Sequence, residues 1–417
     1  MRNIERDLLL KIMLIDKYFI KLTSTLLVVI LFLLFVGVGS GKIIYVKPGN
    51  SIQAAVNNST PGDFVLLKTG DYRENVIVNI SGITVTSDTD SYEDAVVRSL
   101  DENSSVFQIK ADNVTIKSLN ITGSGETVNT LGIWNGVYGP PARIFLEHAN
   151  NCIIEENSLY ENRYGIYLQE SINNTLLHNK FSNNSIWLDE GCSQNKLLGN
   201  TIEKGDLTLG AQCWNNTLFR NRVSNGGGII IGCCGGNNIV STNNVLNCST
   251  GIEIYDVQAK NVLCDNKIID CNYGIDLTFV FKSRVYNNTI SNSSIGIFLR
   301  DNCHENELSN NMIIYSKESG IDLRDEISDN HIYNNYFNNT LNVRVENSAG
   351  NFWNTTKTKR TNIIKGPYLG GNLWANPNGT GFSQIVDDSN SNGIRDQPYR
   401  VNGSDFDYLP LLMRSSA

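Results

Sequence analysis

One short phrase recurs through this 417-residue chain at intervals close to 22 residues or a multiple of that length. It is a Gly-Ile pair set between a turn and an apolar residue. The copies are "RYGIYL" from 163, "STGIEI" from 249, "NYGIDL" from 272, "SIGIFL" from 294 and "ESGIDL" from 318. A fixed period of this length indicates a repeat architecture, in which each unit buries its apolar face only by stacking on its neighbours.

Asparagine recurs in step with this phrase. One column of Asn precedes a short strand and repeats every 21 to 24 residues: Asn179, Asn200, Asn221, Asn243, Asn266, Asn288, Asn311 and Asn335. Stacked amides can hydrogen-bond along a ladder, and Asn tolerates the left-handed backbone. We therefore expect these residues at the corners of stacked coils. We expect the Gly before each Ile at another corner, with positive φ.

Each unit contains three segments of about three to five residues that alternate apolar and polar side chains and favour β-branched residues. This alternation argues against a helical repeat. Strands of this length gain a core when equivalent positions stack about 4.8 Å apart in adjacent coils. The sequence predicts an all-β protein, a right-handed single-stranded parallel β-helix with coils of about 22 residues.

Three regions are expected along the chain. Residues 1–41 contain an apolar run after several basic residues, which indicates a signal peptide or an uncleaved N-terminal membrane anchor, with Met1 or Met13 as the start. Either reading exports the protein, as a secreted or surface-anchored chain. Residues 42–350 form the β-helix, beginning with a short capping helix after Ser51. Residues 351–417 form a C-terminal cap.

The residue after each Gly-Ile pair should point outward. This column supplies Tyr167 and Trp187 as candidates for stacking on sugar rings, and it also supplies acids. The acidic candidates, including those three residues further on, are Glu253, Asp256, Asp276, Asp301, Asp322 and Asp325. Carboxylates on adjacent coils can act as a general acid/base pair on a glycan. The alternative is a solvated polar face without chemistry.

A possible calcium loop lies in the C-terminal region. Asp388, Asn390, Asn392, the Ile394 carbonyl and Asp396 occupy positions 1, 3, 5, 7 and 9 of such a loop. Position 12 is Tyr399, so the bidentate acid of a complete loop is missing. The segment is either a weak calcium site or an Asx-rich turn without metal. No other cofactor is expected to be required.

Charge and cysteine content restrict the partners. The net charge is −8 and no basic run occurs, so nucleic acid is not an expected partner. Cys192, Cys213, Cys234 and Cys303 align with apolar positions, which predicts interior packing. Cys248 and Cys271 share another column on adjacent coils, so they can be free thiols or a disulfide. The four His and four Met form no cluster of soft copper ligands.

Three stretches together resemble a known family. They are "SIQAAV…PGDFVLLKTGDYRENV", the Asn and Gly-Ile coils, and "GNLW…DSNSNGIRDQPY…DYLPL". The chain resembles the NosD-type, periplasmic copper-binding β-helix proteins of the pectin-lyase-like superfamily, particularly archaeal (methanogen) cell-surface proteins. The resemblance implies a surface protein without catalysis that binds glycan or cell-envelope partners. Two alternatives remain open: a lyase, hydrolase or epimerase acting on an acidic polysaccharide, and a copper-binding or maturation protein.

Overall fold

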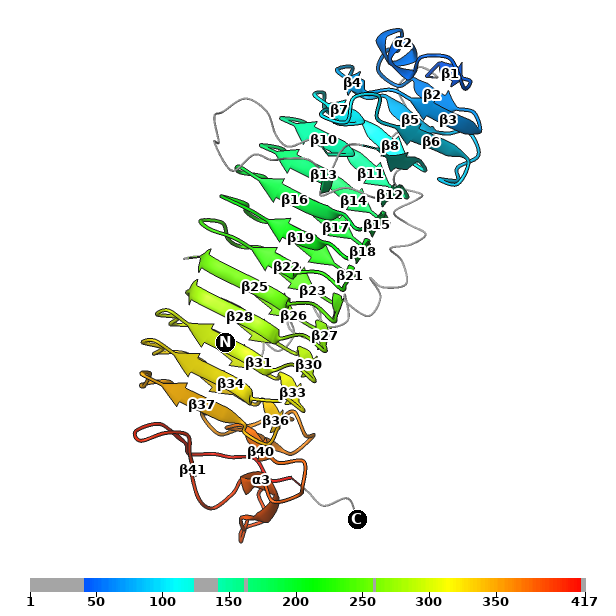
Figure 1. Cartoon of the computed structure of the whole chain (residues 1–417). Coiled ribbons are helices and arrows are strands. Elements are labelled where there is room, and N and C mark those ends of the chain that lie inside the picture. The colour runs from blue at the N-terminus through cyan, green and yellow to red at the C-terminus, as the bar shows by residue number, and fades with distance from the viewer. Residues whose placement is uncertain (1–40, 124–141, 161–163, 258–259, 414–417) are drawn as a thin grey trace. The chain divides into compact units, whose positions relative to one another are not determined.

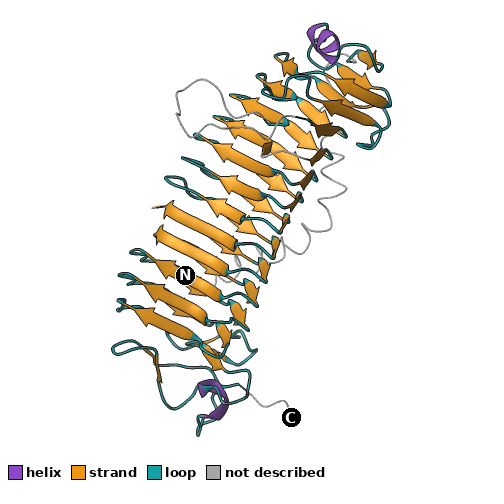
Figure 2. Cartoon of the chain, viewed as in Figure 1, coloured by secondary structure: helices purple, strands orange, loops and turns teal. Residues whose placement is uncertain are grey.

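The strands of each coil pair with the equivalent strands of the coils before and after it (Figures 1 and 2). This computed structural model describes residues 41–123, 142–160, 164–257 and 260–413. Within them the chain passes through three sheets in turn, and all the pairings between coils are parallel. The predicted parallel β-helix, with coils about 22 residues apart, is confirmed.

The predicted signal peptide or membrane anchor falls almost wholly on residues 1–40, which lie outside the described residues. Among the residues that are described, no helix is long and apolar enough to span a membrane. The coils belong to the unit Ile43–Ala417.

Sheet A has 13 strands in the described residues. Most are only three residues long, because each strand lies between two corners of its coil. The central residue of each short strand points into the coil, as Leu218 and Val240 do, and is fully buried. The strands are β1 (Ile43–Val46), β2 (Phe64–Leu67), β5 (Thr84–Ser87), β8 (Thr115–Lys117), β11 (Ile153–Glu155), β14 (Thr175–Leu177), β17 (Lys196–Leu198), β20 (Thr217–Phe219), β23 (Ile239–Ser241), β26 (Val262–Cys264), β29 (Arg284–Tyr286), β32 (Glu307–Ser309) and β35 (His331–Tyr333).

Sheet B also has 13 strands and continues beyond residue 350, because β40 pairs with β36. Its strands are β3 (Gly70–Arg73), β6 (Ala95–Arg98), β9 (Asn120–Thr122), β12 (Ser158–Tyr160), β15 (Lys180–Ser182), β18 (Thr201–Glu203), β21 (Arg222–Ser224), β24 (Asn244–Leu246), β27 (Lys267–Ile269), β30 (Thr289–Ser291), β33 (Met312–Ile314), β36 (Tyr336–Asn338) and β40 (Leu373–Ala375).

Sheet C has 12 strands and carries the Gly-Ile phrase. Two of its strands reach eight residues, so it offers the broadest outer face of the three sheets. Its strands are β4 (Val76–Val78), β7 (Phe107–Ile109), β10 (Ile144–Glu147), β13 (Tyr164–Gln169), β16 (Ser185–Asp189), β19 (Asp206–Leu209), β22 (Gly228–Ile231), β25 (Thr250–Val257), β28 (Tyr273–Val280), β31 (Ile295–Arg300), β34 (Ser319–Arg324) and β37 (Val343–Glu346).

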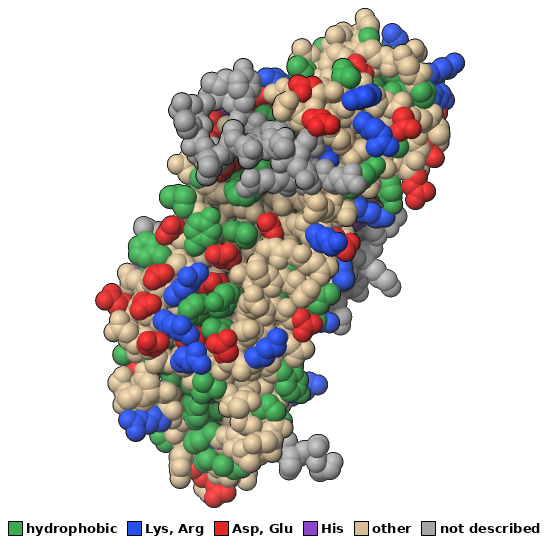
Figure 3. Space-filling view, in the orientation of Figure 1, with side chains coloured by type: hydrophobic (Ala, Val, Ile, Leu, Met, Phe, Trp, Pro, Cys, Tyr) green, Lys and Arg blue, Asp and Glu red, His purple; other side chains and the backbone are tan. Residues whose placement is uncertain are grey.

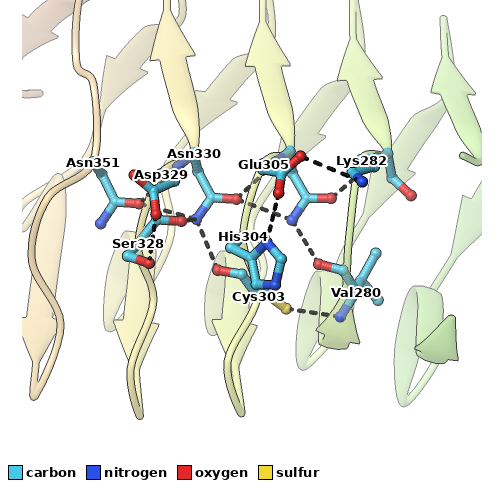
Figure 4. A network of polar contacts seen from close by, with 11 residues as sticks. Val280, Lys282, Cys303, His304, Glu305, Ser328, Asp329, Asn330 and Asn351 are labelled. Carbon is cyan, nitrogen blue, oxygen red and sulfur yellow. Dashed lines mark hydrogen bonds and ion pairs between the residues drawn. The ribbon is translucent and has the colours of Figure 1, made fainter. Parts of the chain in front are cut away.

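The Asn columns form two continuous hydrogen-bonded ladders inside the corners. Asn221 donates from its backbone N and from Nδ2 to the Oδ1 of Asn243, at 2.9 and 3.1 Å, and Nδ2 also donates to the Leu197 carbonyl at 2.8 Å. Figure 4 shows part of the second ladder, in which Asn330 donates to Asn351 at 2.9 Å. These amides satisfy polar groups that would otherwise be buried without partners.

One expectation about backbone conformation was wrong, and a second holds at only one of the Gly residues concerned. The left-handed residue is the one before the ladder Asn, for example Arg220 at φ 56° and Thr242 at φ 58°. That conformation turns the chain so that the following amide points into the corner. The Gly before Ile has positive φ at Gly228, where φ is 117°, but not at the five quoted copies, of which Gly274 is one. A Cβ at Gly274 would lie 2.3 Å from the Gly296 carbonyl oxygen, so close approach of the coils requires the Gly.

Short elements close both ends of the coils. Helix α2 (Ile52–Asn57) begins as predicted after Ser51, whose Oγ accepts the Ala54 N–H at 3.0 Å. At the other end lie helix α3 (Phe382–Ile385) and two small antiparallel pairs, β38 (Thr358–Lys359) with β39 (Tyr368–Leu369) and β41 (Tyr399–Arg400) with β42 (Phe406–Asp407).

Both Asn ladders end on a carboxylate of this C-terminal cap. Asp407 accepts the Asn372 N–H at 2.7 Å, and Asp405 accepts the Asn351 N–H at 3.2 Å. The backbone N–H of each ladder Asn donates to the side chain of the next coil, so the C-terminal end presents N–H groups that favour an anion. Burial nevertheless dominates at Asp407 and raises its pKa to about 7.

Candidate functional site

The outer face of sheet C carries a continuous row of side chains, one from each coil. The strand registers place these residues next to one another, and we call them the outer row: Phe145, Tyr167, Trp187, Thr208, Ile230, Glu253, Asp276, Phe298, Asp322 and Arg344. Adjacent members lie on strands about 4.8 Å apart. The row changes from aromatic at its N-terminal end to charged at its C-terminal end.

The aromatic end combines outer-row residues with Tyr164. The rings of Tyr164 and Trp187 are 5.8 Å apart at an interplanar angle of 83°. Tyr167 is only 2% exposed and its hydroxyl donates to Asp189 at 3.4 Å. Tyr167 therefore cannot stack on a sugar as predicted, because it forms the floor beneath the half-buried Tyr164 and Trp187. Tyr164 was not among the predicted residues, and the signal for it in the sequence is an aromatic residue directly before Gly165.

At the charged end, two predicted acids are buried ion-pair partners. Asp276 is 2% and Asp322 0% exposed. Arg300 holds both oxygens of Asp276, at 3.2 and 3.0 Å, and Arg324 holds both oxygens of Asp322, at 3.0 and 2.7 Å. Figure 3 shows acidic and basic side chains gathered over this part of sheet C. These carboxylates are committed to arginine and are poorly placed to act on a substrate.

The ring of Phe298 completes this ion-paired end. It lies between Asp276 and Asp322 in the outer row, with the guanidinium carbons of Arg300 and Arg324 at 5.5 and 5.1 Å from its centroid. The ring restricts both arginines by cation–π contact. Burial raises the pKa of Asp276, and the Arg300 guanidinium opposes that rise.

Glu253 differs from its neighbours. It is half-buried beside Asp276, and among the described residues it has no hydrogen-bond or ion-pair partner. Burial raises its pKa, with a further contribution from the Asp276 charge. Of the six predicted acids, Glu253 has the surroundings expected of a group that holds and releases a proton.

The other three acids lie at the corner that follows sheet C. Asp256, Asp301 and Asp325 are exposed and have left-handed backbones, with φ between 53° and 65°. The six acids are therefore distributed between a buried row and a corner rather than gathered in one cluster. Within the described residues, no group of three or more His, Cys, Asp or Glu side chains could hold a metal ion.

The predicted calcium loop is held together by its own Asx hydrogen bonds. Asp388 accepts the N–H groups of Asn392 and Gly393 at 3.2 and 2.8 Å, and the Asn390 amide donates to Asp396 at 3.3 Å. Positions 3 and 9 are therefore in contact, and positions 1 and 3 both accept the Asn392 N–H. These three positions contain two carboxylates and one amide, which fits a weak site at most.

The cysteine columns are mostly interior. Cys192, Cys213 and Cys303 are fully buried, as expected, but Cys234 is exposed. Its left-handed backbone, at φ 66°, places it on the corner instead of in the core. Cys248 and Cys271 are buried free thiols on adjacent coils. Their Sγ atoms donate to the backbone carbonyls of Leu246 and Ile269, each at 3.5 Å.

Two solved structures are similar to this chain in their backbone course. The catalytic domain of a GH87 α-1,3-glucanase solved with nigerose is similar over 75% of this chain and 66% of that one, with 14% identity and a TM-score of 0.52. The mannuronan C-5 epimerase AlgE6 A-module of Azotobacter vinelandii is similar over 72% of this chain and 93% of that one, with 13% identity and a TM-score of 0.43. At 14% identity the likeness to the glucanase domain shows a shared fold alone.

No curated protein matches the chain by sequence. The family model described as periplasmic copper-binding protein (NosD) matches residues 56–256 and 208–379. These two matches overlap and together cover most of the coils and the start of the C-terminal cap. The chain belongs to the NosD family.

Proposed function

We propose that this protein is an exported β-helix protein without catalytic activity that binds glycan or cell-envelope components on the outer face of sheet C. One observation carries the proposal: the half-buried rings of Tyr164 and Trp187 stand on a rigid sheet above a packed floor of Phe145 and Tyr167. Aromatic rings fixed in this way provide a large contact area at little entropic cost. The family's periplasmic description is consistent with export.

The state of the acids favours binding over catalysis. Glycoside hydrolysis requires one carboxyl that donates a proton and a second that reaches the sugar or a water molecule. Asp276 and Asp322 are buried and held by Arg300 and Arg324, so neither is free for the second role. The enzyme alternative, a lyase, hydrolase or epimerase, depends on Glu253 as the proton donor, and its raised pKa is the observation in favour.

Copper chemistry fits the residues less well than the family description suggests. Soft thiolate and thioether ligands select Cu(I), and imidazole suits Cu(II). In the described part of the chain, the nearest arrangement is a stacked pair of buried thiols, Cys248 and Cys271, without a third ligand. We derive no function through copper from these residues. Calcium at the Asp388–Asp396 loop remains a proposal, with affinity in the millimolar range.

A glycan array probed with the full chain, followed by analysis of the bound glycans for cleavage products, tests the proposal. Binding that leaves the glycans intact is expected. Cleavage that disappears in Glu253→Gln while binding persists would establish the enzyme alternative. Absence of binding to glycans and to isolated cell envelopes would refute the proposal.

A further inference from the structure

We infer that the aromatic end of the outer row is a subsite for an uncharged sugar, stacked on Trp187 with its hydroxyls hydrogen-bonded to Thr208 and Trp187. This inference rests on the proposed glycan binding and specifies the ligand class and the contacts. It applies to the described residues around strands β13, β16 and β19.

Two polar groups at this position lack partners. Trp187 and Thr208 are register neighbours in the outer row, and neither Trp187 Nε1 nor Thr208 Oγ1 has a hydrogen-bond partner. Thr208 is only 2% exposed, so bulk water does not supply a hydrogen bond to its hydroxyl. Buried polar groups are rarely left unpaired, and those that are usually mark a missing water or ligand.

The surroundings show what such a ligand must supply. Asp189 Oδ1 and Trp187 Nε1 both lie over Gly210, at 2.5 and 3.0 Å from where a Cβ would stand. The site therefore combines an indole N–H donor and a hydroxyl beside a carboxylate that already accepts the Ala211 and Glu190 N–H groups at 2.9 and 3.0 Å. Sugar hydroxyls both donate and accept, so adjacent hydroxyls of one ring can satisfy the indole and the Thr208 hydroxyl.

Access requires a small movement of one side chain. Trp187 is half-buried, whereas its Nε1 atom and Thr208 Oγ1 are covered. A sugar that stacks on the Trp187 ring must draw the indole outward before its hydroxyls reach these atoms. Binding should therefore change the fluorescence of Trp187.

The charges at this end disfavour acidic glycans. The carboxylates of Glu170, Asp189, Glu190 and Asp206 lie on the coils around the two rings. Glu170 pairs with His148 at 3.3 Å, and Glu190 is contacted by the neutral amide of Gln169. Arg300 lies five coils away, about 24 Å at the usual strand spacing. That separation is about three Debye lengths at physiological salt, so Arg300 would not compensate the charge of a uronate at Trp187.

The experiment uses the full chain and two sets of probes, neutral hexose oligosaccharides and hexuronate oligosaccharides of equal length. Tryptophan fluorescence and calorimetry measure binding. We expect neutral oligosaccharides to bind at least about tenfold more tightly, and added salt to narrow the difference by screening. Uronates that bind as well as or better than neutral sugars would overturn the inference.

Two substitutions test the contacts. Thr208→Val and Trp187→Phe each remove one hydrogen-bonding group and keep most of the shape, so each should weaken neutral-sugar binding by up to about tenfold. Thr208→Val should not lower the melting temperature, because the buried Oγ1 has no partner in the free protein. Thr217→Val on sheet A is the matched control and should bind as the wild type does.

The outcomes separate the two proposals. Neutral binding that neither Thr208→Val nor Trp187→Phe weakens refutes the subsite and leaves glycan binding standing. No binding of either probe set, with binding to cell envelopes also absent, refutes both.

Discussion

The ion pair between Asp276 and Arg300 gives the sharpest test of how the outer row is held together. Arg300→Ala would leave the Asp276 carboxylate, 2% exposed, without its cation. Breaking a fully buried pair costs about 3–5 kcal/mol. The Arg300 side chain is 38% exposed, so solvent screens part of the interaction and we expect a loss of about 2–3 kcal/mol.

A second pair on the same molecule provides the control. Arg284 and Glu307 on sheet A lie 3.1 Å apart, with side-chain exposures of 54% and 32%. Because such a pair is well solvated, Arg284→Ala should cost no more than about 1 kcal/mol. Removing the stranded charge in the double variant Asp276→Asn/Arg300→Ala should recover more than about 1 kcal/mol relative to Arg300→Ala alone.

Native-state hydrogen exchange of peptides from β28 and β31 is the appropriate assay, because stacked coils can open locally instead of unfolding as a whole. We expect Arg300→Ala to lower the opening free energy of these strands while Arg284→Ala leaves it almost unchanged. Equal effects of the two substitutions, or no recovery in the double variant, would refute the view that burial makes this pair essential.

Three further predictions concern the ladders, the cap and the thiols. Asn221→Ala should cost about 2–4 kcal/mol in denaturant unfolding, because the Asn200 donors and the Leu197 carbonyl lose their partner; a loss below about 1 kcal/mol would contradict the ladder's role. Burial raises the pKa of Asp407 to about 7, well above its unfolded value, so the protonated form stabilises the cap and stability should fall as the pH rises from about 4 to 7. Asp407→Asn should make the free energy of unfolding less dependent on pH between about 4 and 7. An unchanged dependence would show that Asp407 is not the group responsible. When a small-molecule disulfide is added as oxidant, Cys248 and Cys271 should form a cross-link before Cys192 and Cys213 do. The reason is that Cys271 lowers the pKa of Cys248 to about 7, whereas Cys192 and burial raise the pKa of Cys213. Peptide mapping that finds the Cys192–Cys213 cross-link first would contradict this prediction.

The sequence predicted where the residues of the candidate site lie, but not how exposed they are or which ion pairs they form. The outward column was read correctly from the alternation of side chains, which placed Trp187, Glu253 and Asp276 on one face. Their exposure was not readable, because it depends on long side chains from neighbouring coils. Arg300 comes from the coil after Asp276, and no pattern within either repeat indicates that it bends back to cover the acid.

By itself, the sequence determined the coil period, the strand register and which residues of the strands face the core, because stacking fixes these properties for every copy of a repeat. At the corners it did not, as the exposed Cys234 shows. The tertiary structure decided which outward residues remain open and why each corner residue is needed. Gly274 illustrates the distinction, because its recurrence was visible in the sequence but the reason for it was not. A Cβ at this position would lie 2.3 Å from the Gly296 carbonyl oxygen of the next coil, so close packing and not an unusual φ requires the Gly. The same physical reason applies to Tyr167 and Asp322, since a covered surface arises from contacts between coils, and those distances exist only once the coils have stacked.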